Sequence, residues 1–416
     1  MAVADAGLDA FRIRTDTGGE DDAGADGGSD AGRPALRDPE RCRVEPSDVF
    51  LLGSDADVGA ATRIVGVAGR DTEFGVVWRE AEEGLPQIRL ARVPSTVGDP
   101  AVQTVTDGAF THDEPAIAAV GDGYMIAWVD NSFGDLEVLA RSASADGLGA
   151  VQRLSERVGR DDAPALVSVG ESVVAGWMEN RDMDTTRVAV TRRLDASGAP
   201  SSPPRAISGT PSRLGRLELA PRMGGAVALW TAPSASGADV TLQRLDATGA
   251  PMGTQEVLST EHNASGDVDV GLTSRDGAVV FGALVAGVRR DVRVRLLDGT
   301  GTPGMSEFAL NVGAEFGDSA SVARLREAAG WSEGCRDGYA VVYRSYPDGG
   351  TTPVLRLVLL DAGAAVVRAI DLAPSDVSAR GGRVTLRIAG DGQLLVAWTD
   401  VRDTSVDIRA ARIRCD

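Results

Sequence analysis

Seven short apolar runs of this chain end in an aromatic residue, at intervals of roughly fifty residues. These residues, called the anchor aromatics below, are Trp78, Trp128, Trp177, Trp230, Phe281, Tyr343 and Trp398. Neighbouring anchors are 50, 49, 53, 51, 62 and 55 residues apart. A fixed period of this size indicates that one structural unit recurs along the chain.

The second unit shows what recurs. It contains four short runs that are alternating or β-branched, as strands are: Pro115–Val120, Tyr124–Asp130, Glu137–Ser142 and Ala150–Ser155. Short segments rich in Gly and Asp join many of the runs, which is the chemistry of hairpin turns. A four-stranded antiparallel unit repeated seven times predicts an all-β fold, a seven-bladed β-propeller over residues 42–416.

The two ends of the repeat complement each other. The last unit offers strands at Val384–Ile388, Leu394–Asp400 and Val406–Arg414, with no run for a fourth strand. The segment Asp48–Leu52, ahead of the first inner strand at Thr62–Val67, has the pattern of a fourth strand. We therefore expect the N-terminal strand to complete the last blade, which leaves no long open sheet edge.

This closure gives two of the three cysteines a role. Cys42 precedes the N-terminal strand and Cys415 follows the last strand, so a disulfide between them would replace a missing turn. Such a bond favours an exported location. The alternative is three reduced thiols, Cys335 included, in a cytosolic protein.

Residues 1–41 differ from the repeat. They are rich in Asp, Gly and Ala and carry few residues to bury, so we expect a disordered acidic tether. The segment resembles the tethers behind the lipid-anchor cysteine of bacterial surface lipoproteins, although no anchor cysteine is visible. Residues 1–14 lack the signal-peptide pattern. The expectation is an exported protein, with a lipid tether as one option; the alternative is a solvated tail without a role.

The repeat itself resembles uncharacterised propeller repeats of bacterial exported proteins, in which a strand ends in Trp-x-Asp-x-Arg. Here that element reads Trp398-Thr-Asp400-Val-Arg402, and the strand after it is Asp407–Ile413. The resemblance implies the propeller fold and says almost nothing about activity.

The net charge and the length of the apolar runs limit the kinds of partner that we expect. Acidic residues outnumber basic ones by 19, which argues against nucleic acid and against anionic membrane surfaces. No apolar run is long enough to cross a bilayer as a helix. We expect a monomer that binds a protein or a glycan.

Two sequence patterns imitate enzyme motifs. Residues 330–334 match G-x-S-x-G, but the only histidines, His112 and His262, belong to other units. Residues 299–304 match G-x-G-x-x-G, but no helix follows, so we expect a turn. We predict no catalytic residues and no cofactor.

Acidic residues gather in the loops expected on one face of the ring. The candidate ligand-binding residues of this acidic rim are Asp113, Glu114, Asp130, Asp135, Asp161, Asp162, Glu179, Asp182, Asp400 and Asp403. Such oxygen-rich loops would suit Ca²⁺, a polyol or a basic peptide. The alternative is that each acid caps a turn or pairs with a nearby arginine, as Asp400 would with Arg402. Units four and five lack these acids, so any site is expected off-centre.

The function hypotheses follow from the fold and the rim. The leading one is a non-enzymatic binding or interaction scaffold at the cell surface. A lectin-like protein with glycan pockets between blades is the alternative, and a glycan hydrolase or lyase using acids such as Asp161 and Asp162 is a third. The anchor aromatics are expected to pack between blades rather than stack on sugars. Trp331 lies outside their phase, where it is available to a partner or packs beneath the propeller.

Overall fold

The computed structural model describes residues 42–415 apart from several internal segments. These segments are 56–64, 83, 109, 157–158, 181–185, 210–211, 236, 260–262, 274, 286–288, 312–315, 326–336, 348–352, 373–382 and 402–404. The predicted tether, Trp331 and Cys335 lie outside the described residues. Among the described residues we find no helix with the length and apolar character that a membrane crossing requires.

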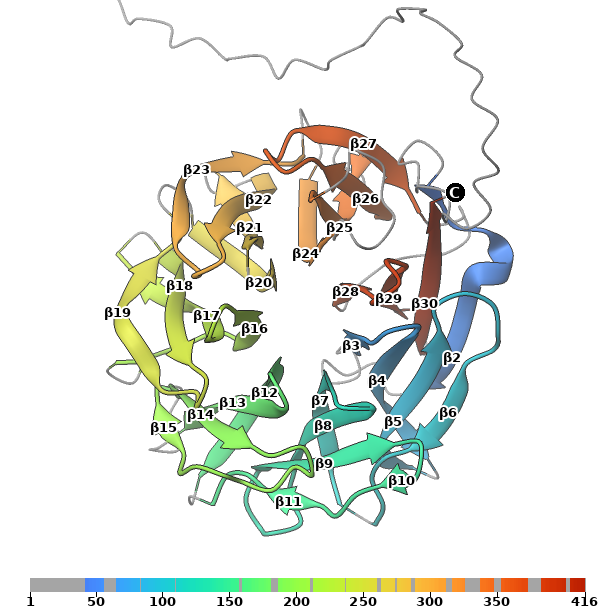
Figure 1. The fold of residues 1–416 in the computed structure, drawn as a ribbon, viewed down its shortest axis with the longest axis vertical. Coiled ribbons are helices and arrows are strands. Elements are labelled where there is room, and N and C mark those ends of the chain that lie inside the picture. Colours follow the sequence, from blue (N-terminus) through green and yellow to red (C-terminus); the bar gives the residue numbers. More distant parts are fainter. Residues whose placement is uncertain are drawn as a thin grey trace, which may run out of the picture. The chain divides into compact units, whose positions relative to one another are not determined.

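Seven antiparallel sheets are arranged in a ring and form a seven-bladed β-propeller (Figure 1). The strands are given from the centre of the ring outwards. Blade one contains β3 (Val65–Gly69), β4 (Glu73–Glu82), β5 (Leu85–Pro94) and β6 (Ala101–Thr104), and blade two contains β7 (His112–Val120), β8 (Gly123–Asp130), β9 (Glu137–Ser144), β10 (Gly147–Leu148) and β11 (Gln152–Arg153). Blade three contains β12 (Arg160–Val169), β13 (Ser172–Asn180), β14 (Val188–Leu194) and β15 (Arg205–Ala206).

Blades four to six repeat the same order. Blade four contains β16 (Glu218–Arg222), β17 (Gly225–Ser234), β18 (Gly237–Asp246) and β19 (Pro251–Val257). Blade five contains β20 (Asn263–Leu272), β21 (Asp276–Val285), β22 (Arg289–Asp298) and β23 (Pro303–Ala309). Blade six contains β24 (Phe316–Arg324), β25 (Tyr339–Tyr346), β26 (Val354–Leu360) and β27 (Val366–Asp371).

Blade seven contains both ends of the described chain, as predicted. Its inner strands are β28 (Val384–Ile388), β29 (Leu394–Val401) and β30 (Val406–Cys415), and β30 pairs with β1 (Cys42–Arg43) and β2 (Val49–Asp55). A single 3₁₀ turn, η2 (Pro46–Asp48), joins β1 to β2. Cys42 is the register partner of Cys415, and the two form the predicted disulfide.

A buried carboxylate adds to this closure. Asp48 is fully buried, Arg414 donates a hydrogen bond to it from Nη2 at 2.7 Å, and Arg414 Nε lies 2.5 Å from its other oxygen. Arg412 lies 3.8 Å from the same carboxylate. The ends of the ring are therefore joined by strand pairing, a covalent bond and an ion pair.

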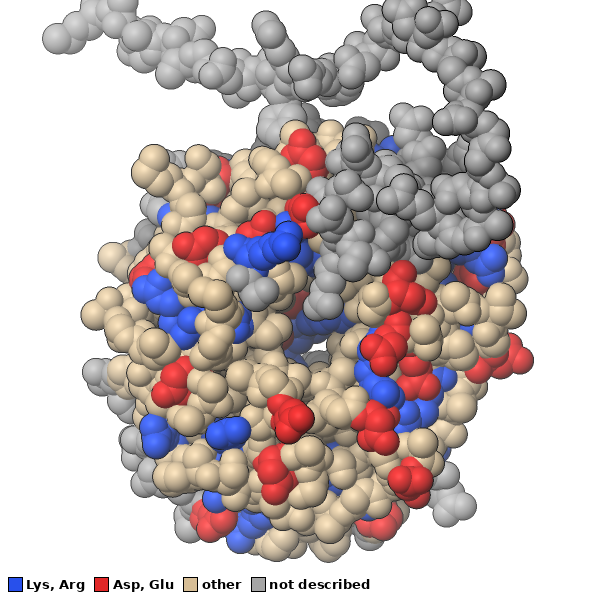
Figure 2. Space-filling model, viewed as in Figure 1, with Lys and Arg blue, Asp and Glu red and all other residues tan. Residues whose placement is uncertain are grey.

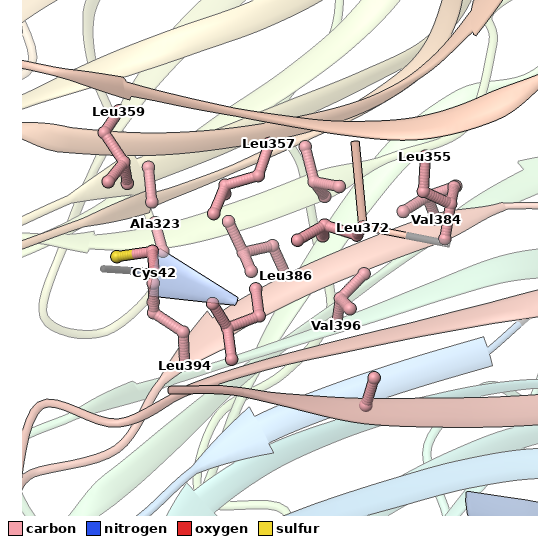
Figure 3. Close-up of a cluster of buried hydrophobic side chains, with 14 of the residues drawn as sticks. Cys42, Ala323, Leu355, Leu357, Leu359, Leu372, Val384, Leu386, Leu394 and Val396 are labelled. Atoms are coloured by element: carbon pink, nitrogen blue, oxygen red, sulfur yellow. The ribbon is translucent and has the colours of Figure 1, made fainter. Parts of the chain in front are cut away.

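The core consists of seven apolar clusters, one between each pair of neighbouring blades. Each anchor aromatic is almost completely buried, and its side chain packs on the blade that precedes it: Trp78 on blade seven, for example, and Trp128 on blade one. The cluster between blades six and seven includes Cys42, beside Leu386 and Leu394 (Figure 3). The prediction that the anchors pack between blades is confirmed, and each such aromatic buries roughly 150–250 Å².

Three turns between third and fourth strands share one hydrogen-bond pattern. Asp195, Asp246 and Asp298 each accept hydrogen bonds from the backbone N–H groups two and four residues later, and from the Ser or Thr hydroxyl of the residue two positions later. These bonds hold the pKa of all three carboxyls below the usual range, although burial alone would raise the pKa of each. Residues 299–302 form such a turn, as predicted, and residues 303 and 304 begin β23.

A glycine completes each of these turns, and Gly249 tests its importance. Its φ is +81°, and a Cβ there would lie 3.1 Å from Val174 Cγ1 of the preceding blade. We expect Gly249→Ala to lower the free energy of unfolding by about 1–2 kcal/mol, because an alanine in the left-handed region is strained. Gly304→Ala, which has no close neighbour, is the control. Equal urea midpoints for the two variants would contradict this expectation.

Two predicted strands differ in detail. The fourth strand of blade two, predicted as Ala150–Ser155, is two short pieces, β10 and β11. Between them the Gly149 carbonyl accepts hydrogen bonds from the Arg141 guanidinium instead of continuing the strand pairing. The innermost strand of blade one begins at Val65 within the described residues, and the predicted start at Thr62 lies outside them.

Candidate functional site

The acids that follow the anchor aromatics are buried rather than displayed on a rim. Asp130, Glu179 and Asp400 each lie two residues after an anchor, so they share its buried face of the strand. Asp130 accepts hydrogen bonds from Trp128 Nε1 at 3.2 Å and from the Ser132 backbone at 2.6 Å, and His112 Nδ1 lies 2.7 Å away.

These contacts decide the charge of Asp130. Burial alone would raise its pKa, but the hydrogen bonds from His112, Ser132 and Trp128 outweigh that effect and lower the pKa from 3.8 to about 2. Asp400 contacts Arg409 Nε at 3.5 Å, whereas its expected partner Arg402 lies outside the described residues. These two acids therefore hold the strand ends together.

Asp161 and Asp162 begin β12 and are both buried. Burial, followed by repulsion from Glu179, Glu137 and Asp162, raises the pKa of Asp161 from 3.8 to about 7, although a hydrogen bond with Ser155 opposes the change. Burial also raises the pKa of Asp162, to about 6, against the opposing charge of Arg187 at 3.0 Å.

The raised pKa of Asp161 predicts how stability depends on pH. The folded state holds this proton more tightly than the unfolded state, so stability is lost as the pH rises from about 4 to about 7. We expect Asp161→Asn to flatten this dependence and to melt at a higher temperature than the wild type at pH 8. Asp146→Asn, on an exposed turn, is the control. Parallel pH profiles of wild type and Asp161→Asn would contradict the assignment.

The remaining predicted residues do not converge on one site. Asp113 accepts a hydrogen bond from the Glu114 backbone at 2.7 Å, and Asp135 is half-buried on blade two. Asp182 and Asp403 lie outside the described residues. Only Glu114 is placed toward the centre of the ring: it sits in a bulge of β7 with a φ of +47°, and its Oε2 accepts the Ala163 N–H at 2.7 Å.

A different group of charged residues lies at the centre of the ring. A hollow of about 450 Å³, counting the part open to solvent, is lined by the inner strands of blades one to four and seven. Figure 2 shows the centre of the ring hollowed, with basic side chains in its wall. The charged lining residues are Arg216, Glu218, Arg383 and Arg387, and the rest of the wall is largely apolar. We call this feature the channel hollow.

Two ion pairs cross between blades here. Arg383, just before β28 of blade seven, reaches Glu218 of blade four, with Nη2 2.6 Å from Oε1. Arg387 of β28 holds Asp269 of blade five through Nη1 at 3.0 Å and Nη2 at 3.2 Å. Asp269 also accepts the Ser321 hydroxyl and the Val322 N–H of blade six. Arginines of blade seven are thus tied to blades that are not its neighbours.

The two carboxyls at the channel shift in opposite directions. Burial raises the pKa of Glu218 even though Arg383 and Arg216 oppose the change. For Asp269 burial acts in the same direction, but the charges of Arg387 and Arg383 outweigh it and lower the pKa. Glu218 therefore holds a proton more readily than an ordinary glutamate, whereas Asp269 remains ionised.

Sequence reasoning missed the channel residues because it searched the loops for acids. One signal was present: Glu218, Asp269 and Arg387 belong to innermost strands, and each has an apolar residue directly before and after it in the sequence. Among the described residues, no group of three His, Cys, Asp or Glu side chains is placed to hold a metal ion.

Comparisons with known proteins bear on the fold. No protein-family model and no curated protein sequence matches the chain. A solved lectin from Burkholderia pseudomallei, BP39L, aligns with a TM-score of 0.54 at 14% identity, over 82% of this chain and 96% of the lectin. A GH43 endo-arabinanase from Bacillus licheniformis aligns with a TM-score of 0.36 at 13% identity, over 60% of this chain and 99% of that one. A subtype N10 neuraminidase-like protein of A/little yellow-shouldered bat/Guatemala/060/2010 aligns with a TM-score of 0.39 at 12% identity, over 73% of this chain and 93% of that one. At these identities the likeness to the lectin shows the propeller fold alone.

Proposed function

We propose that the chain is an exported, non-enzymatic binding propeller whose ligand site is the channel hollow. The observation that carries this proposal is a set of partly exposed charged side chains, Arg216, Glu218, Arg383 and Arg387, around one hollow with apolar walls. Ligand sites commonly combine an apolar lining with a few convergent polar groups. The Cys42–Cys415 disulfide supports export, because such bonds persist in oxidising compartments.

The carboxylates of Asp269 and Asp130 already have several hydrogen-bond or ion-pair partners, and this supports ligand binding over hydrolysis. Both oxygens of Asp269 already accept donors from Arg387, and Oδ2 also accepts the Ser321 hydroxyl and the Val322 N–H. Asp130 is similarly occupied by His112, Trp128 and Ser132. A glycosidase needs two carboxyl groups free to act on the substrate.

A glycan hydrolase is the second candidate, and one observation favours it. The pKa of Glu218 is raised and that of Asp269 lowered, and pairs of acids with diverging pKa values are typical of an acid and a base. Lectin-like pockets between blades have less support, because the seven anchor aromatics are buried and offer no face to a sugar.

A glycan array with and without calcium, followed by a reducing-end assay on each bound glycan, separates these candidates. The proposal expects binding without cleavage, and weaker binding by Arg383→Gln. Cleavage that Glu218→Gln abolishes would replace the proposal with the hydrolase. A ligand retained equally by wild type and Arg383→Gln would place the site elsewhere.

A further inference from the structure

Arg216 is the least satisfied charged group at the channel hollow. A guanidinium carries five N–H donors, yet within the described part of the chain this one makes only two long ion pairs. Nε lies 3.5 Å from Glu218 Oε1, and Nη1 lies 3.9 Å from Glu114 Oε2. The side chain is only 18% exposed, and its Nε is buried without a hydrogen-bond partner. Leaving such donors unpaired is costly, so an acceptor in the hollow would be strongly favoured.

Arg216 also shares its nearest carboxylate with a second arginine. Arg216 and Arg383 share the same oxygen of Glu218, so two guanidiniums face one carboxylate. Glu114 offers Arg216 little more, because its Oε2 already accepts the Ala163 N–H at 2.7 Å. Arg387 is neutralised separately by Asp269. These three arginines therefore meet three carboxylates, but Arg216 makes the longest contacts of the three.

Resting on the proposed function, we propose that the channel hollow binds the carboxylate group of a small organic ligand. Arg216 and Arg383 hold the carboxylate, because the planar fork of a guanidinium matches its two oxygens. The apolar lining that includes Val65, Ile117 and Leu166 holds the carbon body. Glu218 is the internal competitor for the same arginines, which makes its charge a control on affinity.

The competing account is that these ion pairs only plug the channel. The two accounts differ over Glu218→Gln. A carboxylate site gains affinity when the competing charge is removed, and it also gains affinity as the pH falls, because Glu218 is protonated more readily than an ordinary glutamate. If the ion pairs only fill the channel and no ligand binds there, neither change produces any ligand affinity.

The experiment is isothermal titration calorimetry of the whole chain with matched ligand pairs at low salt. The pairs are acetate and acetamide, benzoate and benzamide, and D-glucuronate and D-glucose; phosphate and sulfate test for unspecific anion binding. We expect at least one carboxylate to bind and its neutral partner not to bind. Arg216→Gln should weaken that binding at least tenfold, and Glu218→Gln should tighten it several-fold at pH 7.

Two further variants guard the interpretation. Arg216→Lys keeps the charge and loses the fork, so we expect intermediate affinity and an intact fold. Arg356→Gln removes an arginine whose ion pair with Asp371 lies on the outer strands of blade six, and it should bind as the wild type does. A melting curve for each variant shows that it is folded.

The possible failures are distinguishable. No binding by any carboxylate, equal binding of phosphate, or unchanged affinity in Glu218→Gln overturns the inference. If a neutral ligand binds and Arg216→Gln abolishes it, the carboxylate inference fails and the channel remains the binding site. If a ligand found on the array binds Arg216→Gln and Arg383→Gln as tightly as wild type, the proposed function fails as well.

Discussion

A variant carrying both Cys42→Ser and Cys415→Ser is expected to unfold at a much lower denaturant concentration than the wild type. The disulfide joins residues 373 positions apart, so it restricts the unfolded chain more than almost any other cross-link in this molecule could. On the chain-entropy model the loss is about 6 kcal/mol. Equilibrium unfolding in urea, followed by tryptophan fluorescence without reductant, measures it.

Cys335→Ser is the matched control, since it removes the third cysteine and leaves the closure intact. Reductant should shift the wild type to the midpoint of the double variant and leave the double variant unchanged. Coinciding midpoints for wild type and double variant would mean that strand pairing between β2 and β30 closes the ring without covalent help.

The second large effect is expected at Asp269, which joins three blades. It is 1% exposed, and Arg387, the Ser321 hydroxyl and the Val322 N–H all donate to it. Asp269→Ala leaves the Arg387 guanidinium without this counter-ion beside the channel. Removing one partner of a buried pair typically costs 3–5 kcal/mol, so we expect a loss of about that size.

Asp371→Ala provides the comparison, because Asp371 also forms an ion pair with an arginine, Arg356, but is half exposed. Its removal should cost about 0–1 kcal/mol. The lowered pKa of Asp269 adds a pH test: its contribution is present above the unfolded pKa near 3.8 and is lost as the pH falls through the lower folded pKa. The difference between wild type and Asp269→Ala should therefore shrink in strong acid. Similar losses for the two alanine variants would contradict the structural role of Asp269.

The fold could be predicted because its determinants are periodic. A buried aromatic recurs at the same position in the second strand of each blade, as Trp128 and Trp398 illustrate. A repeat of this kind is visible in the sequence without coordinates. The closure followed from counting strands, and the pairing of Cys42 with Cys415 followed from the closure.

The site could not be predicted in the same way, because it depends on burial and on contacts across the ring. Asp130 and Asp161 look like displayed loop acids in the sequence, whereas both are buried. Asp400 contacts Arg409 of the neighbouring strand, which the antiparallel pairing of β29 and β30 places opposite Trp398. The contact between Arg383 and Glu218 joins residues far apart in the sequence and lies in no recognisable motif.

The most direct test of the account is a crystal structure of the chain grown with the carboxylate that binds most tightly in calorimetry. The account predicts ligand density in the channel hollow, with the carboxylate within hydrogen-bond distance of the Arg216 guanidinium and Arg383 turned from Glu218 toward the ligand. Density for the ligand between blades or on the outer strands, with Arg216 still facing Glu218, would contradict it.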